Sequence, residues 1–344
     1  MVKSNITPKI KEKLGKNLHN QKNHPIEIIK NKIYKYFGES FEKFDSFDPK
    51  VNTVENFDNL LIEKDHPSRR LSDTYYIDDE TVLRTHTSAH QNELLRNGHK
   101  KFLVTGDVYR KDEIDTKHYP IFHQTEGVCI VDDGVDPKEE LIKVLSGLVE
   151  YLFPNCKYRF NEDYFPFTTS SFEVEVEFEG KWMEILGCGV VHEKIMNNCN
   201  LNNKKAWAFG LGLERFAMML FDIPDIRYFW SDDERFLKQF ENGKETKFQP
   251  YSKYPSILRD ISFWANKDKY SYNDFCEILR ESGGDLIESI ELKDEFIHPK
   301  TQRQSYCFRI IYRSNDRTLT SEEIDQIQNV VREKIVFELE VELR

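Results

Sequence analysis

The stretch at residues 206–230 reads AWAFGLGLERFAMMLFDIPDIRYFW, and the interpretation of the whole chain depends on it. Gly210 and Gly212 are separated by one residue, so the backbone here can pass close to a bulky group. The run that follows, residues 213–221, is apolar almost all the way round, which predicts a buried helix. The sequence DIPD comes directly after this run and is expected to end the helix.

Two charged residues, Glu214 and Arg215, lie inside this apolar run. Burying a guanidinium without a partner costs several kcal/mol, roughly, and its five donors suit a carboxylate or a phosphate. Spacing alone therefore leaves two explanations open. Arg215 either pairs with an acid inside the core or binds a phosphate group.

GLGLER followed by an apolar helix resembles the third signature motif of class II aminoacyl-tRNA synthetases. The longer string at residues 210–230 resembles the organellar, single-chain phenylalanyl-tRNA synthetases in particular. The resemblance implies that Arg215 lies on the ATP phosphates and that Gly210 and Gly212 admit the adenosine. It also implies that Phe209 covers the nucleotide or the side-chain pocket. The implied fold class is α+β, with an antiparallel sheet flanked by helices and a C-terminal ferredoxin-like anticodon-binding domain.

Composition sets broad limits on the class of protein. The chain has 344 residues, 39% of them hydrophobic, which is an ordinary globular composition and long enough for two domains. No apolar run approaches the ~18 residues of a membrane span. The six cysteines are scattered without a CxxC pair, which argues against a disulfide framework and a structural zinc site.

The net charge of −11 is unusual for a nucleic-acid-binding protein, so RNA binding would require local basic patches. One candidate is residues 1–35, which hold nine Lys and only two acids, Glu12 and Glu27. Residues 1–24 within it are expected to form a mobile basic arm. They contain no Arg, so they resemble a mitochondrial targeting segment only weakly, although the family implies the mitochondrial matrix.

Residues 85–91 read THTSAHQ, after a predicted strand and at the start of a predicted helix. One capping residue would be enough for a helix, so this collection of hydroxyls, imidazoles and an amide indicates a binding site. The segment matches the family's amino-acid-binding segment. The resemblance implies that it holds the carboxylate and ammonium of the substrate through His86, Ser88, Ala89, His90 and Gln91.

Two strand-like runs, residues 101–110 and 119–131, are separated by a polar loop and resemble the second class II motif. The resemblance implies that Arg110 bridges the α-phosphate of ATP and the substrate carboxylate. It places Phe122 on adenine, and it lets Glu126 stay ionised beside the substrate ammonium. Asp112 stands where the family usually has Glu. The other residues expected to bind ATP, the amino acid or the acceptor end of tRNA are Lys117, His118, Tyr119, Gln124 and Thr125.

Aromatic residues precede an alternating strand at residues 172–178, where the pattern alone favours core packing. The family has an FPF element at this point, which implies that Phe165 and Phe167 contact the benzyl ring of phenylalanine. Gly187 and Gly189, in the next strand, would leave room for that side chain.

A single acid, Glu184, interrupts the apolar strand at residues 181–191. Such a residue is either a paired core charge or a metal ligand. The resemblance places it near ATP and Mg²⁺, so Glu184 is the predicted metal ligand.

The order of predicted elements changes at residue 248. Residues 248–344 read as strand, helix, strand, strand, helix and final strand, the order of a ferredoxin-like module. The strand at 307–313 alternates apolar residues with Arg309 and Arg313, which predicts either a solvated face or an RNA-binding face. The predicted domains are therefore a basic arm at 1–24, a catalytic domain at 25–247 and an anticodon-binding domain at 248–344.

Taken together, the sequence predicts a monomeric, ATP-dependent and Mg²⁺-dependent phenylalanine–tRNA ligase whose partner is tRNA(Phe), with no membrane partner. Two alternatives remain: an RNA-binding relative that has lost its chemistry, and a class II enzyme for another amino acid. The joint presence of Arg110, Gln124, Glu126, Glu184 and Arg215 argues against the first. Phe165 and Phe167 argue against the second.

Overall fold

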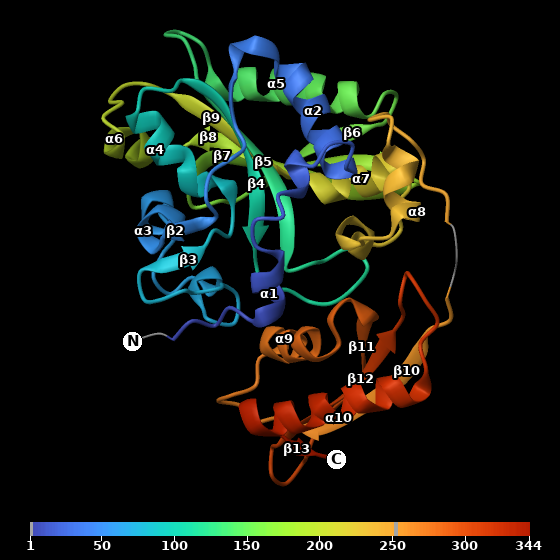
Figure 1. Cartoon of the computed structure of the whole chain (residues 1–344). Helices are drawn as coiled ribbons and strands as arrows, with labels where there is room; N and C mark the ends of the chain where they lie inside the picture. Colours follow the sequence, from blue (N-terminus) through green and yellow to red (C-terminus); the bar gives the residue numbers. More distant parts are fainter. Residues whose placement is uncertain (1–2, 251–253) are drawn as a thin grey trace.

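The computed structural model describes residues 3–250 and 254–344, which form a larger upper part and a smaller lower part (Figure 1). The larger part holds residues 3–250, and the smaller part holds residues 254–344. Within the described residues, no helix combines the length and the apolar character needed to cross a membrane.

A seven-stranded sheet forms the centre of the larger part. Only the pair β1 and β4 is parallel, and every other neighbouring pair is antiparallel. This agrees with the predicted sheet. In spatial order the strands are β1 (Glu42–Phe44), β4 (Lys101–Tyr109), β5 (Ile121–Ile130), β9 (Ala206–Gly212), β8 (Lys181–Val191), β7 (Thr168–Phe178) and β6 (Tyr158–Asp163).

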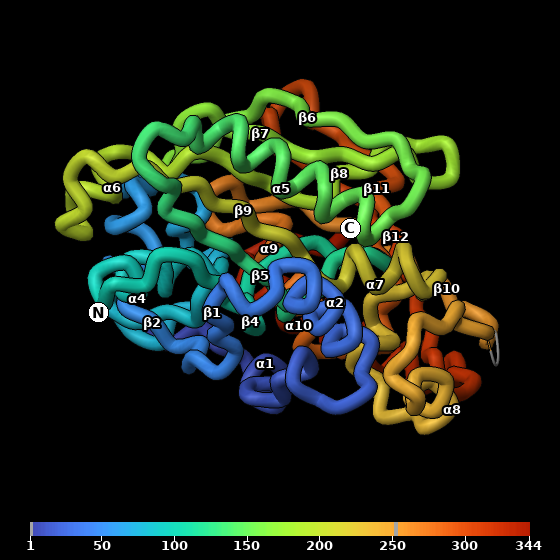
Figure 2. Tube along the Cα trace, turned by 90° about the horizontal axis from the view of Figure 1, so that it is seen from above, coloured from blue at the N-terminus to red at the C-terminus, as the bar shows by residue number. Residues whose placement is uncertain are grey.

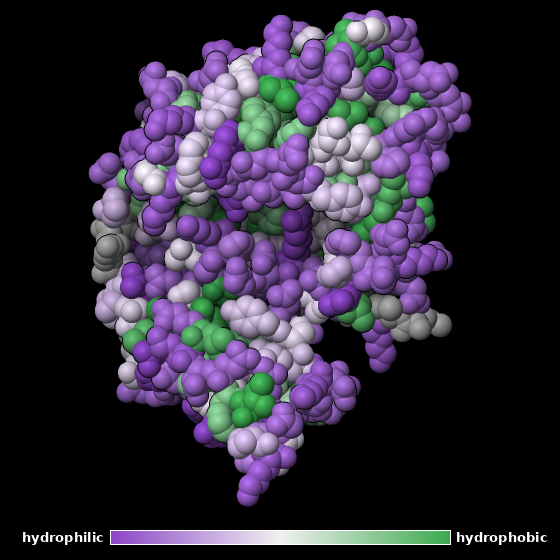
Figure 3. Space-filling model, turned by 180° about the vertical axis from the view of Figure 1, so that it is seen from behind, coloured by the Kyte–Doolittle hydropathy of each residue, from purple (hydrophilic) through white to green (hydrophobic). Residues whose placement is uncertain are grey.

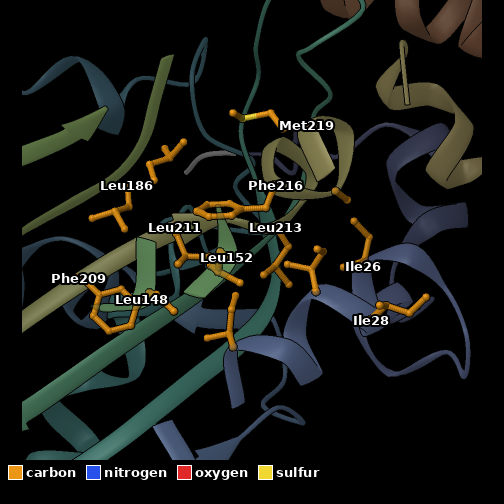
Figure 4. Close-up of a cluster of buried hydrophobic side chains, with 14 of the residues drawn as sticks. Ile26, Ile28, Leu148, Leu152, Leu186, Phe209, Leu211, Leu213, Phe216 and Met219 are labelled. Atoms are coloured by element: carbon orange, nitrogen blue, oxygen red, sulfur yellow. The ribbon is translucent and has the colours of Figure 1, made fainter. Parts of the chain in front are cut away.

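Three helices cover one face of this sheet: α2 (Pro25–Phe37), α5 (Pro137–Leu152) and α7 (Leu213–Phe221) (Figure 2). Proline occupies the first helical position of α2 and α5, where its missing N–H costs nothing. Helix α7 ends as predicted, at Asp222, whose φ of 56° is left-handed. The apolar faces of these helices meet the sheet in the main core, which Figure 4 shows around Phe216 and Leu152.

The opposite face of the sheet is only partly covered. A second core packs there against shorter elements and includes Phe102, Val104 and Val128 from the sheet. The elements around it are β2 (Lys50–Asn52), α3 (Thr53–Asn56), β3 (Thr81–Leu83), α4 (Gln91–Arg96) and α6 (Glu193–Asn198). The remaining area of this face carries the cavity described below.

The N-terminal segment differs from the expected mobile arm. Residues 3–24 include α1 (Pro8–Lys13), and Ile10 and Leu18 are buried in the main core. Lys13 forms an ion pair with Asp285 of the C-terminal part, at 2.9 Å. In Figure 1, α1 lies between the two parts. The Lys- and Asn-rich composition concealed these buried side chains and distant partners.

The C-terminal part has the predicted β-α-β-β-α-β order. It contains β10 (Ile257–Trp264), α9 (Tyr272–Gly283), β11 (Ile287–Ile297), β12 (Gln304–Tyr312), α10 (Ser321–Glu338) and β13 (Glu342–Leu343). Its sheet has the order β11-β12-β10-β13, and a third core lies between this sheet and the two helices. A short helix, α8 (Glu234–Leu237), belongs to the end of the larger part.

Candidate active site

A cavity of about 630 Å³ opens on the less covered face of the seven-stranded sheet. Seen from behind, this face of the molecule is hollowed near its middle (Figure 3). Strands β5, β8 and β9 supply the floor, and the segments at residues 85–91 and 164–168 supply walls. Predicted site residues that line it are His86, Ser88, Gln91, Arg110, Gln124, Glu126, Phe165, Phe167, Glu184, Gly187, Phe209 and Gly210.

Strand β5 divides its side chains between the cavity and the core because successive residues point to opposite faces. Gln124 and Glu126 line the cavity. The predicted binding residue Thr125 points the other way, and its hydroxyl lies 2.8 Å from that of Thr105 in the buried core. Thr125 therefore supports the sheet and does not line the cavity.

The segment at residues 85–91 turns through a short 3-10 helix, η5 (Thr87–His90), before α4 begins. Asn56 holds its start, because its side chain bonds both the N–H and the hydroxyl of Thr85 at 3.0 Å. His86 and Gln91 then face the cavity with buried polar nitrogens that have no partner among the described residues. Burial lowers the pKa of His86 to about 3, with the charge of Arg110 as the second cause, so this imidazole is neutral.

Two of the predicted binding residues in this segment do not line the cavity. The Ala89 side chain is buried in the second core. The His90 ring stacks on Phe47, with 4.4 Å between ring centroids, and its Nε2 lies 3.0 Å from an Arg84 nitrogen. Since Arg84 is itself ion-paired with Asp107 at 2.6 Å, His90 belongs to a buried supporting network.

Glu126 lines the cavity, is buried and accepts a hydrogen bond from the Ser88 hydroxyl. Burial raises its pKa to about 8, and the Ser88 bond offsets this only in part. The expectation of an ionised Glu126 presupposed a neighbouring cation, and in this structure the carboxyl is largely protonated at neutral pH.

Arg110 stands at the end of β4 and is fixed by its neighbours. Its Nε donates a hydrogen bond of 2.7 Å to the Thr85 carbonyl, and its guanidinium carbon lies 5.2 Å from the centroid of the Phe122 ring. Burial lowers its pKa, but a guanidinium stays charged. Within the described part of the chain, no carboxylate lies within 4.0 Å of it. Its two terminal nitrogens are thus free to face an anion in the cavity, while the Phe122 ring packs against it and is not among the lining residues.

The aromatic wall of the cavity is formed by Phe165 and Phe167, whose rings stack with centroids 5.8 Å apart and planes 12° apart. The two predicted glycines make room for this wall itself. A Cβ on Gly187 would stand 2.9 Å from the Phe165 ring, and one on Gly189 would meet the Thr168 side chain at 2.7 Å. Gly189 does not line the cavity, so its expected direct contact with a substrate is not supported.

Glu184 lines the cavity and connects it with the start of α7. Arg215 donates a 2.8 Å hydrogen bond to the Glu184 carbonyl, and its guanidinium lies 3.8 Å from the Glu184 carboxylate. Arg215 is half-exposed and does not line the cavity itself, so it adjoins the cavity through Glu184. Of the two explanations for this arginine, the buried core pair is excluded.

The buried acid of the motif is Glu214, the neighbour of Arg215. Its carboxylate accepts hydrogen bonds from the His123 backbone N–H at 2.8 Å and from His123 Nδ1 at 2.6 Å. This pair joins α7 to β5, so the helix that carries Arg215 is fixed against the strand that carries Gln124. Pattern alone could not identify the partner, because the two residues are 91 positions apart.

Several other predicted residues do not present their side chains to the cavity. Phe209 is among the residues that line it, but its ring lies in the main core (Figure 4), so the ring does not cover a ligand. This ring stacks on Phe37, with 5.4 Å between ring centroids. The Tyr119 hydroxyl donates a 2.6 Å hydrogen bond to Asp285, which places Tyr119 at the junction with the C-terminal part. The predicted residues Lys117, His118 and Gly212 also lie outside, with His118 bound to Asp115 at 2.9 Å.

The cavity also has lining residues that were not predicted, including Asp73, Lys111 and Asn273. Asn273 comes from α9, so the C-terminal part reaches the cavity margin, and its amide lies 3.4 Å from the Asp73 carboxylate. Lys111 directly follows Arg110 in the sequence, and this position could have indicated that Lys111 also lines the cavity. No local pattern could have indicated Asn273, because its position depends on how the two parts pack.

Comparison with known families divides the chain in the same way as the two sheets. Residues 7–240 match the model described as tRNA synthetases class II core domain (F), and residues 252–344 match the ferredoxin-fold anticodon binding domain. A solved pyrrolysyl-tRNA synthetase from Desulfitobacterium hafniense is similar in fold, with a TM-score of 0.50 at 15% sequence identity. That match covers 68% of this chain and 81% of the solved chain.

Curated relatives match along almost the whole chain. The chloroplastic/mitochondrial phenylalanine–tRNA ligase of Arabidopsis thaliana is 51% identical, covering 99% of this chain and 83% of the relative. The mitochondrial phenylalanine–tRNA ligase of Mus musculus is 46% identical, with coverages of 99% and 86%. This chain therefore belongs to the organellar phenylalanine–tRNA ligases, a family of class II aminoacyl-tRNA synthetases with a C-terminal ferredoxin-fold domain.

Proposed function

We propose that the cavity on the seven-stranded sheet is where this ligase joins phenylalanine to AMP and then transfers the phenylalanyl group to tRNA(Phe). The observation that carries the proposal is a set of buried nitrogens without partners, at His86 and Gln91, together with the Arg110 guanidinium, which has no carboxylate partner, beside the stacked rings of Phe165 and Phe167. Unpaired buried polar groups are costly in a folded protein, so a polar ligand is expected to satisfy them. The rings suit a phenyl group at the same time.

The amino acid is expected to bind with its phenyl ring against Phe165 and Phe167. Its ammonium would lie at Gln124 and Glu126, and the site around His86, Ser88 and Gln91 would orient its carboxylate and ammonium. An ammonium near Glu126 would stabilise the ionised carboxylate and bring down its pKa from about 8. Binding of phenylalanine would thus create the charge pair that holds it.

In the first step, a carboxylate oxygen of phenylalanine attacks the α-phosphorus of ATP. A new P–O bond forms, and the bond to diphosphate breaks. No side chain has to act as a strong base because the carboxylate is already ionised. Arg110 would hold the two anions together and stabilise the charge that develops on the phosphorus. Arg215, beside Glu184, would contact the outer phosphates.

In the second step, the 2′-hydroxyl of the terminal adenosine of tRNA attacks the carbonyl carbon of the adenylate. The acyl group passes to the hydroxyl oxygen as its bond to the phosphate oxygen breaks, and AMP leaves with its phosphate accepting the hydroxyl proton. The chain's part in this step is to hold the carbonyl carbon beside the hydroxyl and to keep Arg110 on the departing phosphate.

The residues around Glu184 fit a divalent cation. The pKa of Glu173 is raised, first by burial and then by the charge of Glu184, which indicates two carboxylates near one another. Mg²⁺ prefers one or two carboxylates together with substrate phosphates. Glu184, with Glu173 nearby, would hold the ion, which would neutralise phosphate charge. The proposal also includes a role for Mg²⁺ bound with ATP and a monomeric state. It keeps the predicted domain boundaries, with the catalytic domain at residues 25–247 and the anticodon-binding domain at residues 248–344.

The proposal is tested by the exchange of labelled diphosphate into ATP, driven by phenylalanine. Arg215→Ala is expected to abolish exchange while tRNA binding stays measurable. Arg235→Ala is a matched control, because Arg235 pairs with Asp233 on the surface of the short helix α8. Near-normal exchange in Arg215→Ala would refute the role given to Arg215, and exchange driven by another amino acid would refute the substrate.

A further inference from the structure

Three buried ring nitrogens beside the main core have no hydrogen-bond partner among the described residues. They are Nδ1 of His19, Nε2 of His123 and Nε1 of Trp230, and the three residues are at most 8% exposed. They come from distant parts of the chain: η1 (Leu18–Asn20), β5 and η6 (Ile226–Trp230). The His123 ring is close to both others, with centroids 5.3 Å from His19 and 6.0 Å from Trp230. Since native proteins rarely leave buried polar atoms unpaired, these three nitrogens require an explanation.

The other nitrogen of each imidazole indicates where the proton lies. Nε2 of His19 donates to the Asp45 carbonyl at 3.0 Å, and Nδ1 of His123 donates to the Glu214 carboxylate at 2.6 Å. Burial, followed by the nearby His123, lowers the pKa of His19 to about 4, so its ring is neutral at neutral pH. In neutral rings, the two free imidazole nitrogens are acceptors, whereas the indole N–H of Trp230 can only donate.

The nearest carboxylate cannot satisfy these nitrogens. Asp107 faces His123 across β4 and β5, but it accepts hydrogen bonds from Arg84, at 2.6 Å, and from the Tyr109 hydroxyl. A metal ion would suit two imidazoles, but it would leave the indole N–H without an acceptor. One water molecule can accept a hydrogen bond and donate two, so it matches one donor and two acceptors.

His123 connects this group of nitrogens with the start of α7. The N-cap of α7 is Gly212, which has no side chain to bond the first N–H groups of the helix. Glu214 bonds both the backbone and the ring of His123, and this contact holds the helix start against β5. Arg215 is the next residue, so its position depends on how firmly the His123 ring is held.

We propose that one water molecule joins His19, His123 and Trp230, and that His19 is thereby a positioning residue for Arg215. The water would donate to both imidazoles, accept from the indole and hold the His123 ring against Glu214. The N-terminal segment, which the sequence separates from the catalytic domain, would then help to set the catalytic geometry. The inference rests on the proposed function because it needs Arg215 to contact the phosphates of ATP.

Two substitutions at His19 separate the water contact from the bond to Asp45. Asn offers a carbonyl oxygen close to the position of Nδ1, and Gln offers an amide close to the position of Nε2. His19→Asn therefore keeps an acceptor for the water and loses the bond to Asp45, whereas His19→Gln does the opposite. If the role of His19 were only to anchor the N-terminal segment through Asp45, His19→Asn would be the more harmful change.

The measurement is phenylalanine-driven exchange of diphosphate into ATP by the full-length protein. His19→Gln is expected to lower kcat about tenfold, because a small displacement of a catalytic group is costly, and to leave the KM for phenylalanine unchanged. His19→Asn should stay near the wild-type kcat. A wild-type kcat in His19→Gln, or equal losses in the two variants, would overturn the proposal.

Trp230→Phe tests the third partner, because it removes the indole N–H and keeps an aromatic ring. It is expected to lower kcat several-fold. Combined with His19→Gln, it should add little, since both changes act on the same water. Additive effects would contradict the proposal. The melting temperature of each variant shows that it is folded.

A crystal structure of the full-length protein tests the water itself. Density for one water within hydrogen-bond distance of all three nitrogens is expected in the wild-type protein and should be lost in His19→Gln. A site without density, or one that holds a metal ion, would overturn the proposal. Absence of exchange in the wild-type protein would instead overturn the proposed function and with it the role of Arg215, whereas the density would still decide the water site.

Discussion

The cavity and the junction between the two parts of the molecule treat buried polar groups in opposite ways. At the junction, buried Lys111 pairs with Asp274 at 3.1 Å and buried Tyr75 donates to Glu277 at 2.8 Å, and the partly exposed Lys13 pairs with Asp285 at 2.9 Å. In the cavity, the nitrogens of His86 and the amide of Gln91 have no partner among the described residues.

This difference distinguishes polar groups that stabilise the fold from polar groups that are available to bind a ligand. A paired polar group at the junction has already recovered the free energy of its desolvation, whereas an unpaired one in the cavity recovers it only when substrate binds. Substitutions in the cavity should therefore change catalysis strongly and stability little. Substitutions at the junction should do the reverse.

The largest effect is expected from Arg110→Ala. Removing one preorganised charge from a developing anion typically costs about 100- to 1,000-fold in rate. Phenylalanine-driven exchange should fall by that factor, with little loss in melting temperature because Arg110 has no carboxylate partner to leave unpaired. Arg309→Ala, which removes an exposed, paired arginine, should exchange normally. A wild-type exchange rate in Arg110→Ala would contradict the conclusion that unpaired polar groups in the cavity act in catalysis.

The next effect concerns pH. Because the pKa of Glu126 is about 8 and ammonium binding needs its ionised form, the KM for phenylalanine should rise about tenfold for each pH unit below 7. Glu126→Gln should have a raised KM without this dependence. The protonated carboxyl stabilises the fold fully below the unfolded pKa of about 4.5, and this contribution is lost as pH rises through 8. The melting temperature of wild type relative to Glu126→Gln should fall over the same window.

A smaller effect is expected from Gly187→Ala. Its Cβ would push the Phe165 ring, 2.9 Å away, into the cavity, so the KM for phenylalanine should rise several-fold while the KM for ATP changes little. Combining it with Phe165→Leu gives a double-mutant cycle, and the two changes should be clearly non-additive if the ring carries the effect. Additive effects would mean that Gly187 acts in some other way.

The smallest effect is expected from Lys13→Ala at the junction. The partly exposed ion pair and the contacts of Lys13 with the Tyr119 and Trp230 rings should contribute about 1 kcal/mol to stability. Denaturant unfolding would measure this loss, and exchange should stay near normal. Lys11→Ala, on the exposed side of the same helix, is the control. A large loss of exchange would show that the junction acts on the chemistry.

Much of the fold could be predicted because it depends on local patterns. Helix α2 begins at Pro25 as expected, and the C-terminal β-α-β-β-α-β order follows from alternation and helical spacing. Phe209 could not be assigned correctly in the same way. Whether it faces the cavity or the core depends on its pairing with Gly127 across β5 and β9, which no single strand reveals.

Contacts that span the chain were likewise beyond prediction. Tyr119 was expected at the substrate because it lies in the second motif, but its hydroxyl binds Asp285, 166 positions later. The N-terminal segment appeared mobile because of its lysines, yet Thr7 bonds Glu277 at 3.2 Å. Both depend on the docking of the C-terminal part, which local propensity does not encode.

Successive side chains of β5 point alternately to the cavity and to the core, and this limits insertions and deletions within the strand. Shortening or lengthening the strand by a single codon near Gln124 would turn Thr125 toward the cavity and Glu126 into the core, so one event would both change the cavity lining and place a carboxyl among apolar side chains. A point substitution there changes one side chain, whereas a one-codon insertion or deletion reverses the facing of the residues that follow it. Length variation among relatives should therefore avoid the segment from residue 121 to 130 and gather in the loops on either side.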